Sequence, residues 1–131
     1  MGDPQHNVET AQRFTEAVIR GDYGAAAAEL DPEVEIDDTD IPESTGADSF
    51  SAWLARWNQS WESWRIEDLE VRPVGDDATI SLFKMIVRGK GSGIELTRED
   101  ATVAEFRAGK IVRIGYYNDQ AQALAAAGLA K

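Results

Sequence analysis

Apolar residues near the start of the chain recur every three or four positions, the spacing of one face of an α-helix: Val8, Ala11, Phe14 and Val18. Asp3 is followed by a proline, so this helix can begin with an N-cap and a proline at its first position. Gly21 ends the pattern, and Asp22 can cap a second, shorter helix that stops before Asp31-Pro32. The sequence therefore predicts two consecutive N-terminal helices.

Four tryptophans dominate the next segment and follow the same helical spacing: Trp53, Trp57, Trp61 and Trp64. A short strand at 34–36 and an acidic, turn-rich stretch at 37–46 precede them, and Thr45 and Asp48 have the spacing of a capping box. We therefore predict a third helix over 47–62 with the tryptophans in one stripe. The stripe fits core packing against a sheet or, as the alternative, the wall of a pocket for an aromatic ligand.

Turn signals divide the rest of the chain into four expected strands, at 66–74, 78–88, 94–107 and 111–118. Asp119 can cap a closing helix over 120–127, which Gly128 ends. Three helices followed by an antiparallel meander indicate an α+β fold. Helices that cover one face of a curved antiparallel sheet would form a cone with an interior mouth, a geometry suited to a small-molecule pocket.

The composition narrows the functions that such a fold could serve. The chain has 131 residues, which suits a single domain over residues 1–131, and a net charge of −11. That charge repels phosphate backbones and anionic membranes, so we expect no nucleic-acid partner and no membrane partner. No apolar run reaches the ~20 residues that cross a bilayer. The polar first residues predict no secretory signal, and we expect a cytoplasmic protein.

Several kinds of catalytic site are excluded by residue type. The chain has no cysteine, which rules out disulfides, thiol nucleophiles and thiolate metal sites. Its single histidine, His6, lies near a chain end and offers no Ser-His-Asp arrangement, and the carboxylates match no EF-hand pattern. The glycine-rich segment 89–93 joins two strands and opens no helix, so it is not a phosphate-binding loop. We therefore expect neither a metal nor a cofactor.

An ordered set of motifs runs through the chain: Arg20-Gly21-Asp22, Leu30-Asp31-Pro32-Glu33-Val34, the glycine-rich hairpin at 88–96, Phe106-Arg107-Ala108-Gly109-Lys110, and Tyr117-Asn118-Asp119-Gln120. In this order they resemble the SnoaL-like branch of the nuclear-transport-factor-2-like superfamily. The resemblance implies a cone-shaped α+β barrel, in which a strongly curved antiparallel sheet wraps around the N-terminal helices. It also implies an internal pocket and a homodimer formed through the sheet. The superfamily includes polyketide cyclases, steroid isomerases, epoxide hydrolases, dehydratases and non-catalytic binding domains, so the fold does not fix a reaction.

The catalytic residues of the steroid isomerases match this chain only in part. Phe14 stands where those enzymes have an oxyanion-stabilising tyrosine, and Thr102 stands where they have a second donor, an aspartate. Their general-base aspartate matches Asp37, whereas alternation along the strand at 34–36 favours Asp38 as the inward-facing carboxylate. Either one, held in an apolar pocket, could abstract a proton, and the alternative is a solvated acidic loop.

Period-two alternation places a further set of side chains on one face of the third long strand: Arg98, Asp100, Thr102, Ala104 and Phe106. If this face is inward, Asp100 could form an ion pair with Arg88 or Lys84 on the neighbouring strand. Tyr117 would add an aromatic ring from the last strand. The expected ligand-binding residues are therefore Phe14, Val18, Trp53, Trp57, Asp100, Thr102, Phe106 and Tyr117.

Three functions are compatible with these patterns. The first is a small-molecule-binding domain whose internal apolar pocket takes a small hydrophobic, ring-containing ligand; it is favoured because the donor positions of the isomerases are not kept. The second is a cofactor-independent acid–base enzyme of isomerase, cyclase, hydrolase or dehydratase type, with Asp37 or Asp38 as the base. The third is a non-catalytic dimerisation module. Identification of a bound ligand would separate the first two from the third.

Overall fold

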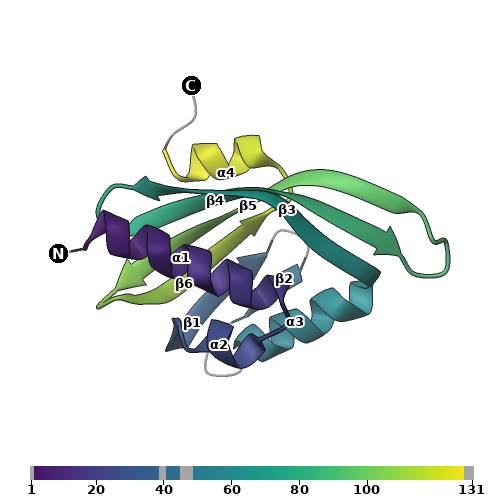
Figure 1. The fold of residues 1–131 in the computed structure, drawn as a ribbon, viewed down its shortest axis with the longest axis horizontal. Coiled ribbons are helices and arrows are strands. Elements are labelled where there is room, and N and C mark those ends of the chain that lie inside the picture. Colours follow the sequence, from purple (N-terminus) through teal and green to yellow (C-terminus); the bar gives the residue numbers. More distant parts are fainter. Residues whose placement is uncertain (1, 39–40, 45–48, 129–131) are drawn as a thin grey trace.

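The computed structural model describes residues 2–38, 41–44 and 49–128, which contain helices on both sides of a sheet (Figure 1). The helices are α1 (Pro4–Ile19), α2 (Tyr23–Ala27), α3 (Ser49–Ser60) and α4 (Gln120–Ala126). The strands are β1 (Leu30–Asp38), β2 (Ile41–Ser44), β3 (Trp61–Val74), β4 (Ala78–Gly89), β5 (Glu95–Arg107) and β6 (Lys110–Tyr117).

The six strands form one sheet in the order β2-β1-β6-β5-β4-β3. Figure 1 shows α1 and α3 against one face of the curved sheet and α4 against the other. The predicted α+β fold, a curved sheet around the N-terminal helices, is confirmed, although β2 and β3 remain edges and the barrel is not closed. The sheet is also not wholly antiparallel as predicted, because β1 pairs with β6 in parallel. The long chain between these two strands provides the crossover that a parallel pair requires.

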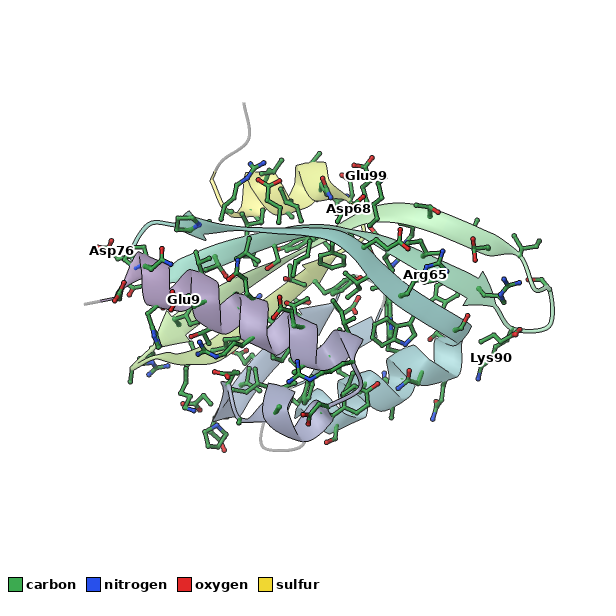
Figure 2. The ribbon with its side chains drawn as sticks, in the orientation of Figure 1. Glu9, Arg65, Asp68, Asp76, Lys90 and Glu99 are labelled. Carbon is green, nitrogen blue, oxygen red and sulfur yellow. The ribbon has the colours of Figure 1, made fainter. Side chains whose placement is uncertain are left out.

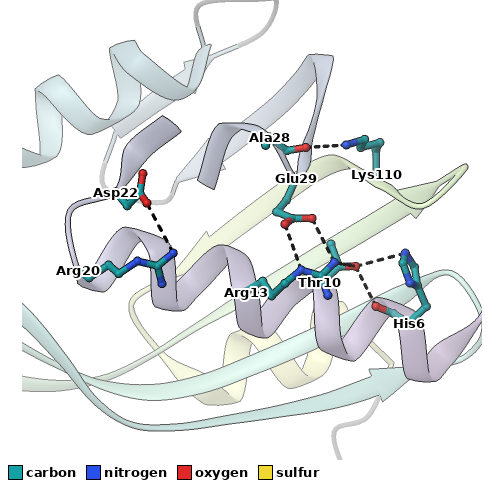
Figure 3. Close-up of polar contacts among 8 residues, drawn as sticks. All are labelled: His6, Thr10, Arg13, Arg20, Asp22, Ala28, Glu29 and Lys110. Carbon is teal, nitrogen blue, oxygen red and sulfur yellow. Dashed lines mark hydrogen bonds and ion pairs between the residues drawn. The ribbon is translucent and has the colours of Figure 1, made fainter. Parts of the chain in front are cut away.

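Hydrogen bonds and an ion pair connect α1 to the neighbouring segments. The side chain of Asp3 accepts hydrogen bonds from two backbone N–H groups of the first turn, so the helix begins with the predicted cap. Further along α1, Arg13 forms an ion pair with Glu29 at 3.1 Å (Figure 3). Lys110, at the start of β6, donates to the carbonyl oxygen of Ala28 at 2.6 Å. The segment between α2 and β1 is thereby tied to both α1 and β6.

The largest departures from the predicted elements lie between residues 30 and 64. Strand β1 is longer than the expected 34–36 and includes Pro32, which lies at a register irregularity where its missing N–H is tolerated. The acidic stretch expected to be a turn contains β2, which pairs with β1. The predicted capping box of Thr45 and Asp48 lies outside the described residues. Helix α3 ends at Ser60, so Trp61 and Trp64 belong to β3. Their helical spacing continued past the end of the helix by coincidence, so the predicted four-residue stripe was wrong for these two residues.

Two hydrophobic clusters lie on the two faces of the sheet. The inner cluster fills the space between the sheet and helices α1 to α3, and the smaller outer cluster lies beneath α4. Strand alternation explains the division, since Phe83 of β4 joins the inner cluster whereas its neighbour Leu82 joins the outer one. Within the described residues, no helix is long and apolar enough to cross a membrane.

The turn between β5 and β6 fixes the position of the last strand. Arg107 pairs with Lys110, so only Ala108 and Gly109 lie between the strands, and both have positive φ values, 53° and 78°. This is the geometry of a type I′ turn, whose twist matches that of the flanking strands. Glycine adopts positive φ freely, whereas the Cβ of Ala108 makes the same conformation strained.

Candidate functional site

A row of polar side chains crosses the inner face of the sheet. Tyr116 on β6 is in register with Asp38 on β1 and, on its other side, with Thr102 on β5. Thr102 is in turn in register with Ser81 on β4. Asp100 lies two residues from Thr102 and therefore on the same face of β5. Neighbouring strands thus bring one predicted catalytic residue and two predicted ligand-binding residues together beneath α1 and α3.

The two candidate catalytic carboxylates point in opposite directions. Asp38 is 4% exposed, and its Oδ2 accepts a hydrogen bond of 2.8 Å from the indole Nε1 of Trp53. Asp37 has a side chain that is 48% exposed and forms an ion pair with Arg113 at 3.2 Å. The orientation therefore follows the alternation along β1: Asp38 faces the interior and Asp37 faces the surface.

Asp100 is the most deeply buried acidic side chain of the site, with no exposed surface. Its Oδ2 accepts hydrogen bonds from the hydroxyl of Tyr116 at 2.6 Å and from the guanidinium of Arg98 at 2.8 Å. The predicted ion pair with Arg88 or Lys84 was wrong, because those residues lie on the outer face of β4 and bind Glu95 and Asp68 instead. Among the described residues, the second carboxylate oxygen, Oδ1, has no hydrogen-bond partner.

Tyr116 is the functional candidate that the sequence analysis did not select. Burial, together with the nearby Asp100 carboxylate, holds the pKa of Tyr116 well above its usual value of 10. The hydroxyl is therefore protonated at neutral pH and remains a hydrogen-bond donor. Its ring lies 6.0 Å from that of Trp53 and 5.3 Å from that of Trp57.

Tyr117 occupies the opposite face of β6. It packs in the outer cluster and is in register with Ala101, beneath α4. The interpretation of Tyr117 as a pocket residue is therefore corrected, because adjacent residues of a strand face opposite sides and Tyr116 takes the inward position. The available signal was the pair Tyr116-Tyr117 itself, but alternation separates two neighbours without telling which of them is inside.

The remaining predicted pocket residues lie in or beside the inner cluster. Trp53, Trp57, Val18 and Phe106 are buried, and Phe14 is partly buried, with its ring 5.6 Å from the ring of Phe50. The described residues enclose a cavity of about 10 Å³ between α1 and the sheet, lined in part by Phe14 and Thr102. This volume is about that of one water site. In this structure the protein's own aromatic rings therefore occupy most of the expected interior pocket.

A larger hollow opens at the surface between α1 and β3, and we call it the α1–β3 groove. Its volume is about 410 Å³. It is lined by Val18, Ile19, Gly21, Tyr23, Asn58, Trp61, Glu62, Ser63, Trp64, Arg65 and Ile66. The ring of buried Trp57 lies 6.4 Å from the rings of Trp61 and of Trp64, and it also contacts Tyr116. The side chain of Trp57 thus separates the groove from the buried polar groups.

The chemistry available at this site is that of carboxylates, a phenol and indoles. In the part of the chain that the structure describes, no group of three or more His, Asp or Glu side chains is placed to hold a metal ion. The Asp38 carboxylate can accept a proton or a hydrogen bond, and the Tyr116 hydroxyl can donate a hydrogen bond. The arrangement therefore suits the orientation of an uncharged polar group within an apolar ligand, and it pairs a candidate base with a candidate donor.

Comparison with known proteins places the chain among related folds. A model of the SnoaL-like domain matches residues 11–114. Among solved structures, a candidate polyketide cyclase from Xanthomonas campestris pv. campestris is 22% identical, with 95% of this chain and 98% of that chain covered and a TM-score of 0.79. An NTF2-like protein of unknown function from Burkholderia pseudomallei K96243 is 21% identical over 92% of this chain and 95% of its own, with a TM-score of 0.78.

A third similar structure is that of a protein crystallised with a small molecule. TerC, co-crystallised with polyporic acid, is 16% identical over 94% of this chain and 98% of its own, with a TM-score of 0.77. The comparison with curated proteins gives no match. At these identities, the likeness to solved structures establishes the fold.

Proposed function

Since the chain belongs to the SnoaL-like domain family, we propose that it binds a small, mainly apolar, ring-containing ligand between α1, α3 and the inner face of the sheet. The observation that carries the proposal is the set of polar groups buried among aromatic rings: Asp38, Asp100 and Tyr116. Burial of charged groups lowers stability unless they are compensated, and such groups gather at functional sites. The rings would supply apolar contact area, and the few polar groups would orient the ligand.

Binding in this space requires that some of the rings move. Trp57 is the side chain to test first, because it contacts Tyr116 on the interior side and both Trp61 and Trp64 at the groove. A rotation of Trp57 would join the α1–β3 groove to the buried polar groups. TerC was crystallised with polyporic acid, and the Xanthomonas protein is a candidate polyketide cyclase. These relatives make an organic small molecule the first kind of ligand to test.

The test combines a binding screen with one truncation. Native mass spectrometry after incubation with a mixture of aromatic and polycyclic compounds should show retained ligand, which titration then quantifies. Trp57→Ala should weaken the binding of that ligand by more than about 1 kcal/mol, or roughly fivefold, as truncated aromatic contacts commonly do. Tyr117→Phe, on the outer face, is the control and should leave the affinity unchanged. Absence of any retained compound would contradict the proposal and favour a non-catalytic dimerisation module.

A second candidate function, acid–base catalysis, is favoured by the register of Asp38 with Tyr116. In this scheme the Asp38 carboxylate would take a proton from a carbon next to a ligand carbonyl. The Tyr116 hydroxyl, whose single hydrogen is donated to Asp100 in this structure, would turn to the ligand and donate that hydrogen bond to the oxyanion that develops on the carbonyl. Asp38→Asn should then retain ligand affinity and lose turnover, because an amide cannot accept the proton. Turnover that survives in a folded Asp38→Asn variant would exclude Asp38 as the base.

A further inference from the structure

The α1–β3 groove is chemically different from the interior site. Two of the side chains that line it are apolar and exposed to a degree unusual for this chain, Ile19 at 44% and Tyr23 at 37%. The partly buried rings of Trp61 and Trp64 line the same hollow. Its volume of about 410 Å³ lies within the range of small-molecule sites. An exposed concave surface lined by three aromatic residues is suited to a small ligand.

The side chains that line the groove leave an excess of negative charge. Two charged side chains line it, Glu62 and Arg65. Arg65, which is labelled in Figure 2, forms ion pairs with Glu67 at 2.9 Å and with Glu95 at 3.5 Å, so its positive charge is balanced within the sheet. For Glu62, the described residues provide no ion pair. The groove therefore retains one uncompensated carboxylate in a protein whose net charge is −11.

The C-terminal end of helix α1 adds a negative electrostatic potential to that of Glu62. Val18, Ile19 and Gly21 line the groove where α1 terminates, so the negative end of the helix dipole lies there. No basic residue occupies the last turn of α1, and the C-cap residue Arg20 lies 3.7 Å from Asp22. The aromatic residues complement this field, since the face of an aromatic ring attracts cations. Trp61 already attracts a cation within the protein, because the guanidinium carbon of Arg98 lies 5.9 Å from the centroid of its ring.

We infer that the α1–β3 groove binds an organic cation with an apolar surface, of the substituted-ammonium class. Methyl groups on a quaternary nitrogen would contact Ile19, Trp61 and Trp64, while the charge would be attracted by the rings, Glu62 and the end of α1. An inorganic cation lacks the apolar contacts, a neutral molecule lacks the electrostatic attraction, and an anion would be repelled. The inference does not depend on the interior site, because the groove is open while the interior is filled.

The first experiment compares two probes of the same shape. Choline and 3,3-dimethylbutan-1-ol differ in the replacement of the quaternary nitrogen by carbon, so their affinities isolate the effect of the charge. Titration followed by tryptophan fluorescence and calorimetry should show choline binding at least about fivefold more tightly. Trp64→Leu should reduce the choline affinity by a similar factor. Equal affinities of the two probes, or no choline binding at roughly 10 mM, would overturn the inference.

A charge scan on one helix then locates the cation. Ile19→Lys and Ile19→Glu both remove the isoleucine contact, so they are compared with each other, and Ile19→Glu should bind choline about tenfold more tightly than Ile19→Lys, the effect of opposite charges near a solvent-exposed site. Gln12→Lys and Gln12→Glu make the same changes of net charge at an exposed position of α1 outside the groove and serve as matched controls. Equal effects at the two positions would show a response to net charge alone and would overturn the location. Circular dichroism confirms that each variant is folded.

Discussion

Removal of the Tyr116 hydroxyl should destabilise the protein, although the ring itself is kept. In Tyr116→Phe, the buried Asp100 carboxylate loses a 2.6 Å hydrogen bond and retains the guanidinium of Arg98. A hydrogen bond to a charged group contributes about 1.5–3 kcal/mol, and no solvent reaches Asp100 to replace it. We therefore expect the free energy of unfolding at pH 7 to fall by roughly 1.5–3 kcal/mol, and Tm to fall by roughly 5–10 °C.

The same variant should change the dependence of stability on alkaline pH. The pKa of Tyr116 is raised in the folded protein, because the hydroxyl is buried and lies beside Asp100. Unfolded tyrosine titrates near pH 10, so above that pH the unfolded state loses a proton that the folded state keeps. Wild-type stability should therefore fall as the pH rises above about 10, by up to roughly 1.4 kcal/mol per pH unit from this group. Tyr116→Phe lacks this contribution, so the stability difference between the two proteins should narrow there.

Urea denaturation followed by far-ultraviolet circular dichroism, at a series of pH values from 7 to about 11, measures both effects. Tyr23→Phe removes an exposed hydroxyl and is the control, with an expected change within about 0.5 kcal/mol at pH 7. A Tyr116→Phe protein as stable as the wild type at pH 7 would refute the reasoning, since it would show that Asp100 does not depend on this donor. A constant difference from pH 7 to 11 would refute the linkage.

Four further outcomes are expected. Trp53→Phe removes the indole donor to Asp38 and should lower the free energy of unfolding by at least about 1.5 kcal/mol in urea denaturation; an unchanged value would contradict that role. Ala108→Asn, at the positive-φ position of the β5–β6 turn, should raise it by about 0.5–1 kcal/mol. Light scattering at micromolar concentration should show a homodimer rather than a monomer. Electrophoretic shift assays at physiological salt should show no binding of duplex DNA, given the net charge of −11.

The order of the elements could be predicted from the sequence because caps, turns and periodicities are local signals. The caps at Asp3, Asp22 and Asp119 each begin a helix in the structure. Local signals failed where two elements meet without a turn, as at the junction of α3 and β3. Trp61 follows the helix directly, and its helical spacing from Trp57 gave no indication of the change. The boundary depends instead on pairing with β4, a contact that spacing does not reveal.

The candidate site could be predicted only as far as alternation along single strands allows. Alternation identified the side chains that share a face, and on β1 it gave the inward orientation of Asp38. On β6 it could not choose between Tyr116 and Tyr117, because both are aromatic and either could face the core. The partner of Asp100 was also missed, since Arg98 reaches it along the same strand rather than across strands. These features depend on side-chain packing between elements distant in sequence.

The parallel pairing of β1 with β6 has a consequence for how the protein folds during synthesis. Asp38 and Tyr116 are brought together by this pairing, although β3, β4 and β5 are synthesised between β1 and β6. Until β6 is made, the edge of β1 that pairs with it is uncovered, and the backbone N–H and C=O groups of that edge remain available to other chains. The meander of β3, β4 and β5 needs only nearby contacts and can form earlier. The buried polar site is therefore assembled after the meander, and truncation within β6 should yield a chain that retains the meander but aggregates through β1.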